Sequence, residues 1–104
     1  MDERTRTDGG TVVDPADRVA VRRQLERFAG ESAVEATGEG HLQATFGGRT
    51  RVTVTADGSV EAEMPLHAFR GPADRLEFDH EDGELRVTHA LGPNGTTTYV
   101  FRRP

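Results

Sequence analysis

The feature that most constrains this chain is a change in the spacing of its apolar residues at Gly30. Before Gly30, the residues Val21, Leu25 and Phe28 recur at helical spacing and therefore share one face of a helix. After Gly30, apolar and polar residues alternate, which is typical of strands with one buried face and one wet face. The change predicts an α+β domain in which one N-terminal helix is followed by antiparallel hairpins.

The ends of the helix are predicted from three residues. Asp14 can accept hydrogen bonds from unpaired backbone N–H groups, and Pro15 suits the first helical position. Gly30 can take the left-handed conformation that often follows the last residue of a helix. These signals predict a helix over residues 15–29.

The length of 104 residues is usual for a single domain. Residues 1–12 are charged, contain glycine and lack an apolar period, so we expect a flexible tail there and one α+β domain over 13–104. The chain has no cysteine, which excludes disulfides and thiolate metal sites. No apolar run approaches the ~20 residues of a membrane span and the N-terminus is not signal-like, so we expect a cytoplasmic protein without a membrane contact.

Turn residues predict the pairing of the strands that follow the helix. Loops at 38–40, 47–48 and 56–58 separate the first group of strands. At 56–58 we expect a three-residue turn with Gly58 in a bulge, because a two-residue turn would place valines opposite glutamates. The predicted partners are Val34 with Ala44, Ala36 with Leu42, Ala44 with Val52, Leu42 with Val54, Val54 with Val60, and Val52 with Ala62.

A second group of strands follows an interruption at 64–74 (MPLHAFRGPAD). Its two prolines and glycine predict a connector or one short helical turn, anchored in the core by Leu66 and Phe69. Turns at 82–83 and 93–95 then predict the remaining strands. The predicted partners are His80 with Leu85, Phe78 with Val87, Leu76 with His89, Val87 with Phe101, and His89 with Tyr99.

Together these elements predict one helix packed on a curved antiparallel meander of about seven strands, four before the connector and three after it. The sequence leaves open whether the strands form one curved sheet or two sheets. An open sheet must protect its edge strands, so a strand edge is a candidate contact surface.

The kinds of charged residue are more informative than the net charge of −5. All 13 basic residues are arginines, and neither lysine nor isoleucine occurs. In composition the chain resembles proteins of salt-loving archaea, a likeness that identifies no family. An acidic surface favours solubility and disfavours non-specific binding to nucleic acids or anionic membranes.

The stretch from Val60 to Ala90 combines a strand, the connector and the segment LEFDHEDGELRV. It is similar to the α-crystallin domain of small heat-shock proteins, in which a proline-bearing connector also precedes a strand, a D-G-x-L turn and a further strand. The resemblance implies a β-sandwich holdase that dimerises. The chain ends in FRRP and lacks the I-x-I anchor typical of that family.

The histidines are the first candidates for chemistry. His80 and His89 fall on the same predicted face, and His89 with Tyr99 could form a pocket base hydrogen-bonded to the tyrosine hydroxyl. The alternative is a histidine at the edge of the core whose ring packs and whose nitrogens have partners. No nucleophile elbow, zinc motif or phosphate-binding loop occurs. We therefore predict no catalytic residue, no metal site and no cofactor. Whether the protein is an enzyme is left open, and the sequence favours a protein without enzymatic activity.

The helix offers a second candidate. Arg22, Arg23 and Arg27 lie away from the apolar stripe and form a basic face that could dock an acidic partner or a phosphate backbone. The alternative is a solvated face whose arginines offset the helix dipole and pair with Glu26. A single helix cannot build a helix-turn-helix, so nucleic acid is not the expected partner.

The leading functional prediction is a non-enzymatic protein-interaction module that binds an unknown protein partner or a second copy of itself through a sheet edge. One alternative is a small-ligand-binding or catalytic cup lined by His89, Tyr99 and His80. Further alternatives are a nucleic-acid adaptor that uses the helix arginines and an α-crystallin-like holdase.

Overall fold

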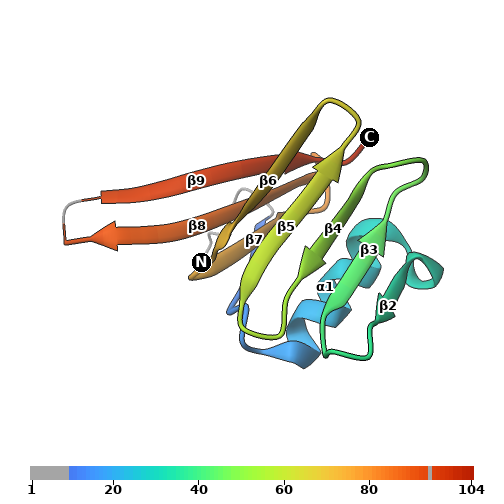
Figure 1. Ribbon diagram of the computed structural model, residues 1–104, viewed down its shortest axis with the longest axis horizontal. Helices are drawn as coiled ribbons and strands as arrows, with labels where there is room; N and C mark the ends of the chain where they lie inside the picture. Colours follow the sequence, from blue (N-terminus) through green and yellow to red (C-terminus); the bar gives the residue numbers. More distant parts are fainter. Residues whose placement is uncertain (1–9, 94) are drawn as a thin grey trace.

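The protein is α+β, with one α-helix and nine strands among the residues that the computed structural model describes, 10–93 and 95–104 (Figure 1). All paired strands are antiparallel, and they form two sheets with the orders β1-β7-β8-β9 and β2-β3-β4-β5-β6. The elements are β1 (Gly10–Val13), α1 (Arg18–Ala29), a 3-10 turn (Glu31–Ala33), β2 (Val34–Ala36), β3 (Leu42–Thr45), β4 (Arg51–Val54), β5 (Ser59–Met64), β6 (His67–Pro72), β7 (Arg75–Asp79), β8 (Glu84–Gly92) and β9 (Gly95–Arg102).

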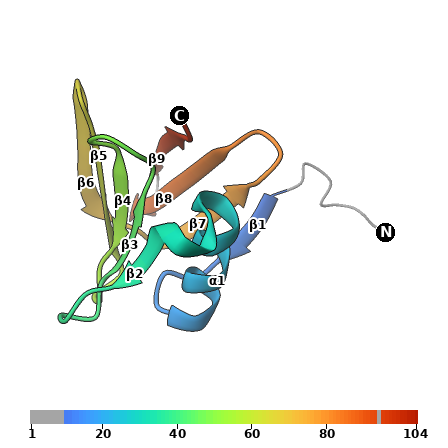
Figure 2. The same ribbon diagram turned by 90° about the vertical axis from the view of Figure 1, so that its right-hand side faces the viewer.

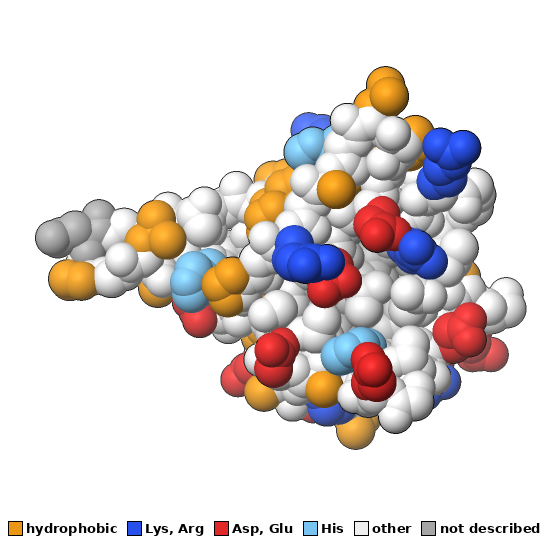
Figure 3. Space-filling model, viewed as in Figure 1, with side chains coloured by type: hydrophobic (Ala, Val, Ile, Leu, Met, Phe, Trp, Pro, Cys, Tyr) orange, Lys and Arg blue, Asp and Glu red, His pale blue; other side chains and the backbone are white. Residues whose placement is uncertain are grey.

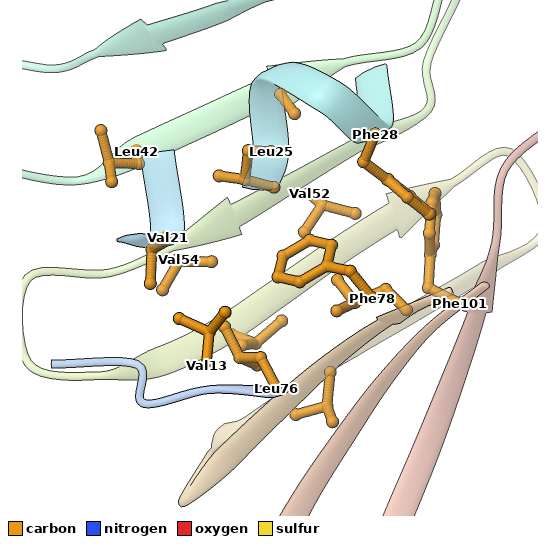
Figure 4. Close-up of a cluster of buried hydrophobic side chains, with 14 of the residues drawn as sticks. Val13, Val21, Leu25, Phe28, Leu42, Val52, Val54, Leu76, Phe78 and Phe101 are labelled. Atoms are coloured by element: carbon orange, nitrogen blue, oxygen red, sulfur yellow. The ribbon is translucent and has the colours of Figure 1, made fainter. Parts of the chain in front are cut away.

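The two sheets form a wedge whose wide side is filled by α1 (Figure 2). Val21, Leu25 and Phe28 on the predicted apolar face of the helix are buried between the sheets. The Phe28 ring lies 5.8 Å from that of Phe46 and 5.7 Å from that of Phe78, so it links the helix to both sheets. The buried cluster also draws on β1, β3, β4 and β9 (Figure 4).

The helix begins at Arg18, three residues later than predicted. Asp17 is its N-cap and accepts a hydrogen bond from the Ala20 N–H at 3.2 Å. Asp14 instead caps a preceding turn, in which its carboxylate accepts from the Ala16 N–H at 2.9 Å. Both aspartates suit an N-cap, and the prediction chose the wrong one. The C-terminal end at Ala29 is confirmed, with Gly30 following at a φ of 103°.

The predicted register of the first group of strands is confirmed. Its success has a physical reason, since each short loop contains a glycine at positive φ that restricts the turn to a few geometries. The confirmed partners are Val34 with Ala44, Ala36 with Leu42, Ala44 with Val52, Leu42 with Val54, Val54 with Val60, and Val52 with Ala62.

The predicted connector is wrong, because residues 67–72 form strand β6, which pairs along the whole of β5. Its prolines are compatible with a strand, since Pro65 lies in the turn and Pro72 ends an edge strand. Leu66 lies at the tip of this hairpin with 99% of its surface exposed, so it does not anchor the core. Phe69 is half-buried and packs against the core as expected.

The predicted register of the second group is wrong by two residues. β7 ends at Asp79 and β8 begins at Glu84, so four residues form the turn instead of two. A shift of two leaves every side chain on the same face, and the alternation of apolar residues therefore cannot detect it. The acidic pair Asp79 and Glu84 is tolerated because Glu84 accepts from Arg86 at 2.8 Å and lies 2.9 Å from Arg102. The observed partners are Leu76 with Val87, Phe78 with Leu85, Val87 with Tyr99, and Leu85 with Phe101.

Strand β1 was not predicted. It pairs with β7 and includes residues 10–12 of the predicted tail; residues 1–9 lie outside the described part of the chain. Val13 is buried and Val12 is exposed, and a single alternation is too short to register as a period. The predicted α+β class, with one N-terminal helix and antiparallel strands, is confirmed, and the described residues form two sheets of nine strands in all where about seven strands were predicted. Within the described residues, α1 falls short of the length and apolar character that crossing a bilayer requires.

Candidate interaction surface

The most distinctive surface is the outer part of the β8–β9 hairpin, which projects beyond the rest of the molecule as a two-stranded ribbon (Figure 1). We call residues 89–93 and 95–98 the arm. The pairing of β7 with β8 reaches only to Thr88, so among the described residues β8 pairs with β9 alone within the arm. Leu91 lies at a bulge near the tip with 66% of its surface exposed. In Figure 3 the arm carries hydrophobic side chains, whereas the arginines in this view lie over the body of the molecule.

The arm leads into an edge strand without the usual protection. β9 is eight residues long, ends its sheet and contains no charged side chain from Gly95 to Phe101. Edge strands are normally short or carry charges, prolines or bulges that prevent pairing with another chain. The other edges have such features, since β1 and β2 have four and three residues and β6 contains Arg70 and Pro72. β9 is therefore the most accessible edge of the described residues.

The backbone groups that face outward from β9 can be identified from one hydrogen bond. The Arg103 N–H donates to the Gly83 carbonyl oxygen at 2.7 Å, which makes these two residues a hydrogen-bonded pair. Such pairs alternate along an antiparallel ladder, so every second residue of β9 directs its N–H and C=O away from β8. In the observed register those residues are Thr96, Thr98, Val100 and Arg102.

Tyr99 lies on the inner face of β9 and joins the two sheets. Its ring stacks on Phe69 of β6 with a centroid distance of 4.1 Å and an interplanar angle of 4°. His67 adds a second stacked ring at 5.7 Å. Burial raises the pKa of the Tyr99 hydroxyl. The aromatic ring thus fixes the base of the arm to the five-stranded sheet.

His89 does not pair with Tyr99, because its partner across the ladder is Thr97. Its Nδ1 lies 3.3 Å from Oδ2 of Asp74 without the geometry of a hydrogen bond, and the Ala90 N–H donates to the same oxygen. The carboxylate therefore lies where β8 leaves the sheet and enters the arm. The predicted pairing of His89 with Tyr99, on which the suggested hydrogen bond between them depended, is wrong.

His80 lies in the turn after β7, at the junction of the helix and the four-stranded sheet. Its Nε2 is 2.7 Å from Oε1 of Gln24, and its ring stacks on Phe78. Burial lowers the pKa of His80, and the cations Arg27 and Arg103 lower it further against the opposing effect of Asp79. The structure thus places His80 against the helix and His89 beside Asp74, and it stacks the Tyr99 ring against strand β6. These three residues do not lie together.

The predicted basic face of α1 is only partly continuous. Arg22 and Arg23 border an open groove of about 480 Å³ together with Val19, which is 69% exposed. Arg22 is paired with Glu26 at 3.2 Å, as the solvated-face alternative predicted. Arg27 does not line this groove, and its positive charge instead lowers the pKa of His80.

Arg18 is a residue that the sequence analysis missed. Its guanidinium donates at 3.0 to 3.1 Å to four carbonyl oxygens that belong to the pre-helix turn, the β2–β3 loop and the end of β4. A cation in the first turn of a helix opposes the helix dipole, and this mismatch was a signal that another role compensates. The acceptors are the carbonyls of Pro15, Gly40, Val54 and Thr55.

Other surfaces of the described residues offer little for chemistry. Three open grooves of about 440 to 530 Å³ are prominent on the described residues, and His80, His89 and Tyr99 do not line these three. Across residues 10–93 and 95–104, no three histidine or acidic side chains lie close enough to hold a metal ion. Neither a protein-family model, nor a curated protein, nor a solved structure matches this chain.

Proposed function

We propose that this protein is a non-enzymatic interaction module that binds its partner through the free edge of β9, by adding an extended strand to the four-stranded sheet. The observation that carries the proposal is the uncharged edge from Gly95 to Phe101, half of it on an arm that projects from the body. Strand addition uses backbone hydrogen bonds for affinity and alternate side chains for selectivity.

The outward groups of β9 suit this role. Thr96, Thr98 and Val100 present backbone donors and acceptors in the regular spacing that an added strand requires. Threonine, valine and aromatic residues favour the extended conformation, so the edge is ordered before a partner arrives. The stack of Tyr99 on Phe69 holds the base of the strand in place.

The geometry favours this proposal over the ligand-binding cup. A cup needs His80, His89 and Tyr99 around one cavity, and each contacts a different element instead. It is also favoured over the arginine adaptor, because Arg22 is already paired and Arg27 lies outside the groove.

Site-specific photo-crosslinking in the cells that make the protein tests the proposal. A benzoyl-phenylalanine at position 98 is expected to form covalent adducts with a partner, because that residue faces the free edge. The same probe at position 39, in the exposed β2–β3 turn, is the matched control and should give none. Absence of adducts at position 98, or equal adducts at both positions, would overturn the proposal.

A further inference from the structure

We propose that the strand that adds to β9 is β9 of a second copy of this chain, paired antiparallel about a two-fold axis at Thr98. This inference rests on the proposed function and names its partner. Two-fold interfaces are the commonest form of self-association, and they require a surface that is complementary to itself. The β9 edge meets this requirement in backbone geometry, in side chains and in charge.

The backbone geometry limits the register. A hydrogen-bonded ladder forms only where outward-facing residues of one copy meet outward-facing residues of the other. With the axis at Thr98, this residue meets its own counterpart, and Thr96 meets Val100 of the second copy. By symmetry Val100 also meets Thr96 of the second copy, and the three pairings supply about six backbone hydrogen bonds.

The charge pattern selects this register among those that the backbone allows. Within β9 the uncharged segment runs from Gly95 to Phe101, and its central residue is Thr98. Pairing about Thr98 therefore matches the whole uncharged segment with itself and leaves Arg102 beyond the ladder. Moving the axis to Tyr99 would bring Arg102 into the ladder. It would also move the tip of each arm past Arg102, the last residue of β9, in the second copy. A chain of net charge −5 repels its own copy, so an uncharged strip is the favourable place for contact.

The side chains agree with this pairing. On the outer face, Thr98 lies beside its counterpart and Thr96 beside Val100, and β-branched residues pack well in cross-strand pairs. On the inner face, Thr97 lies beside Tyr99 of the second copy. The two four-stranded sheets would join into one continuous sheet, which removes the exposed edge from both copies.

Cysteine trapping tests the register directly, because the chain contains no cysteine of its own. In the proposed dimer the two residues at position 98 have Cα atoms about 5.5 Å apart, a separation that a disulfide can bridge. Thr98→Cys is therefore expected to yield a covalent dimer under mild oxidation. Thr96→Cys is the matched control, because its two copies lie about 14 Å apart along the ladder and should form no disulfide. The double variant Thr96→Cys/Val100→Cys should again crosslink. Equal crosslinking of Thr96→Cys and Thr98→Cys, or none by Thr98→Cys, overturns the register.

Sedimentation of the full chain tests the association itself. The wild-type mass is expected to rise from monomer to dimer with concentration, and salt should favour the dimer because it screens the repulsion between two chains of net charge −5. Thr98→Pro removes an N–H that points only to the free edge and should remain monomeric at the same concentrations. If Thr98→Pro does not fold, Thr98→Lys blocks the edge by charge and serves the same purpose.

The outcomes separate this inference from the proposed function. A wild-type chain that stays monomeric at millimolar concentration, but forms photo-adducts with another protein at position 98, would overturn self-pairing and support the proposed function. Adducts of twice the monomer mass, together with a dimer by sedimentation, support both. Absence of adducts together with a monomer overturns both.

Discussion

Arg103 and Phe28 connect the end of the chain to the end of the helix. The Arg103 guanidinium donates from Nη1 to the Phe28 carbonyl oxygen at 3.0 Å, and its Cζ lies 5.3 Å from the centroid of the Phe28 ring. Carbonyls in the last turn of a helix have no partner within the helix, so Arg103 acts as a C-terminal cap. The same contact places a cation over the aromatic ring that joins both sheets.

Replacing Arg103 with alanine should lower the free energy of unfolding by about 1–2 kcal/mol, because it removes a charged hydrogen bond and a partly exposed cation–π contact. Urea unfolding followed by circular dichroism measures the change. Arg49→Ala, in the exposed β3–β4 turn, is the control and should stay within about 0.5 kcal/mol of the wild type. Equal effects of the two substitutions would contradict the capping role.

We expect the fold to be destabilised even by the conservative replacement of Arg18 with lysine. The four carbonyls around its guanidinium lie on separate segments, and only the planar fork of arginine reaches them together. We expect Arg18→Lys to cost about 2 kcal/mol, since lysine keeps the charge but loses most of these bonds. Arg22→Lys, at an exposed ion pair one turn along, should change the unfolding free energy by about 0.5 kcal/mol or less. Urea unfolding of both variants decides whether the geometry of Arg18 or merely its charge stabilises the fold.

The pKa of His80 should lie below its ordinary value of 6.5, first because of burial and then because of Arg27 and Arg103. Proton NMR of the imidazole ring during a pH titration measures this value. Arg27→Ala should raise the pKa of His80 by removing a nearby positive charge. Arg23→Ala, on the same helix, should leave it unchanged. A pKa of 6.5 or higher in the wild type would show that the ring is not held in its neutral form.

The lowered pKa of His80 has a consequence for stability. A proton binds the unfolded chain more readily than the folded one, so this contribution is complete above about pH 6.5 and is lost as the pH falls toward the lowered folded value. His80→Gln removes the titration but keeps a side chain that can bond to Gln24. Between about pH 8 and pH 5 the wild type should therefore lose more unfolding free energy than the variant. Parallel pH curves in urea unfolding would contradict this expectation.

The sequence predicted the register of the four strands joined by short glycine turns, and it missed the pairing of strand β1, which comes from a distant segment. Gly58 restricts a tight hairpin, and the register around it follows from local geometry. The pairing of β1 with β7 joins residues more than sixty positions apart, and no local pattern records it. In the turn before Glu84, a two-residue shift preserved the burial pattern, so the wrong partners were as well matched as the right ones.

The sequence predicted that a strand edge is a candidate contact surface, but it did not predict which strand supplies that edge. The alternation predicts a strand after the turn at 93–95, but the position of that strand at an edge depends on the order of strands in the sheet. Arg18 and Arg103 escaped prediction for a related reason, because their acceptors are backbone carbonyls from other segments. The absence of charge from Gly95 to Phe101 was visible in the sequence, and it acquires meaning only once that segment is known to be an edge.

The stack of Phe69 on Tyr99 should be detectable as an energetic coupling between the two sheets. Phe69→Ala and Tyr99→Ala should each destabilise the fold, and the double variant should show a coupling of about 0.5–1.5 kcal/mol, the usual range for aromatic pairs. Urea unfolding of the wild type, the two single variants and the double variant measures this coupling as a double-mutant cycle. Additive effects would mean that the rings are neighbours without a specific interaction.

The tyrosine itself provides an independent measure of the same stack. Tyr99 is the only tyrosine, so the absorbance of its ionised form reports one site. Burial raises the pKa of Tyr99 above 10.0, and Phe69→Ala exposes the ring and should bring the pKa down toward that value. Phe46→Ala is the matched control, since Phe46 packs on Phe28 and Phe101 and should destabilise the protein without lowering the pKa of Tyr99. If both substitutions lower the pKa equally, the ring responds to general loosening of the core, and the base of the β8–β9 arm is not fixed by its contact with β6.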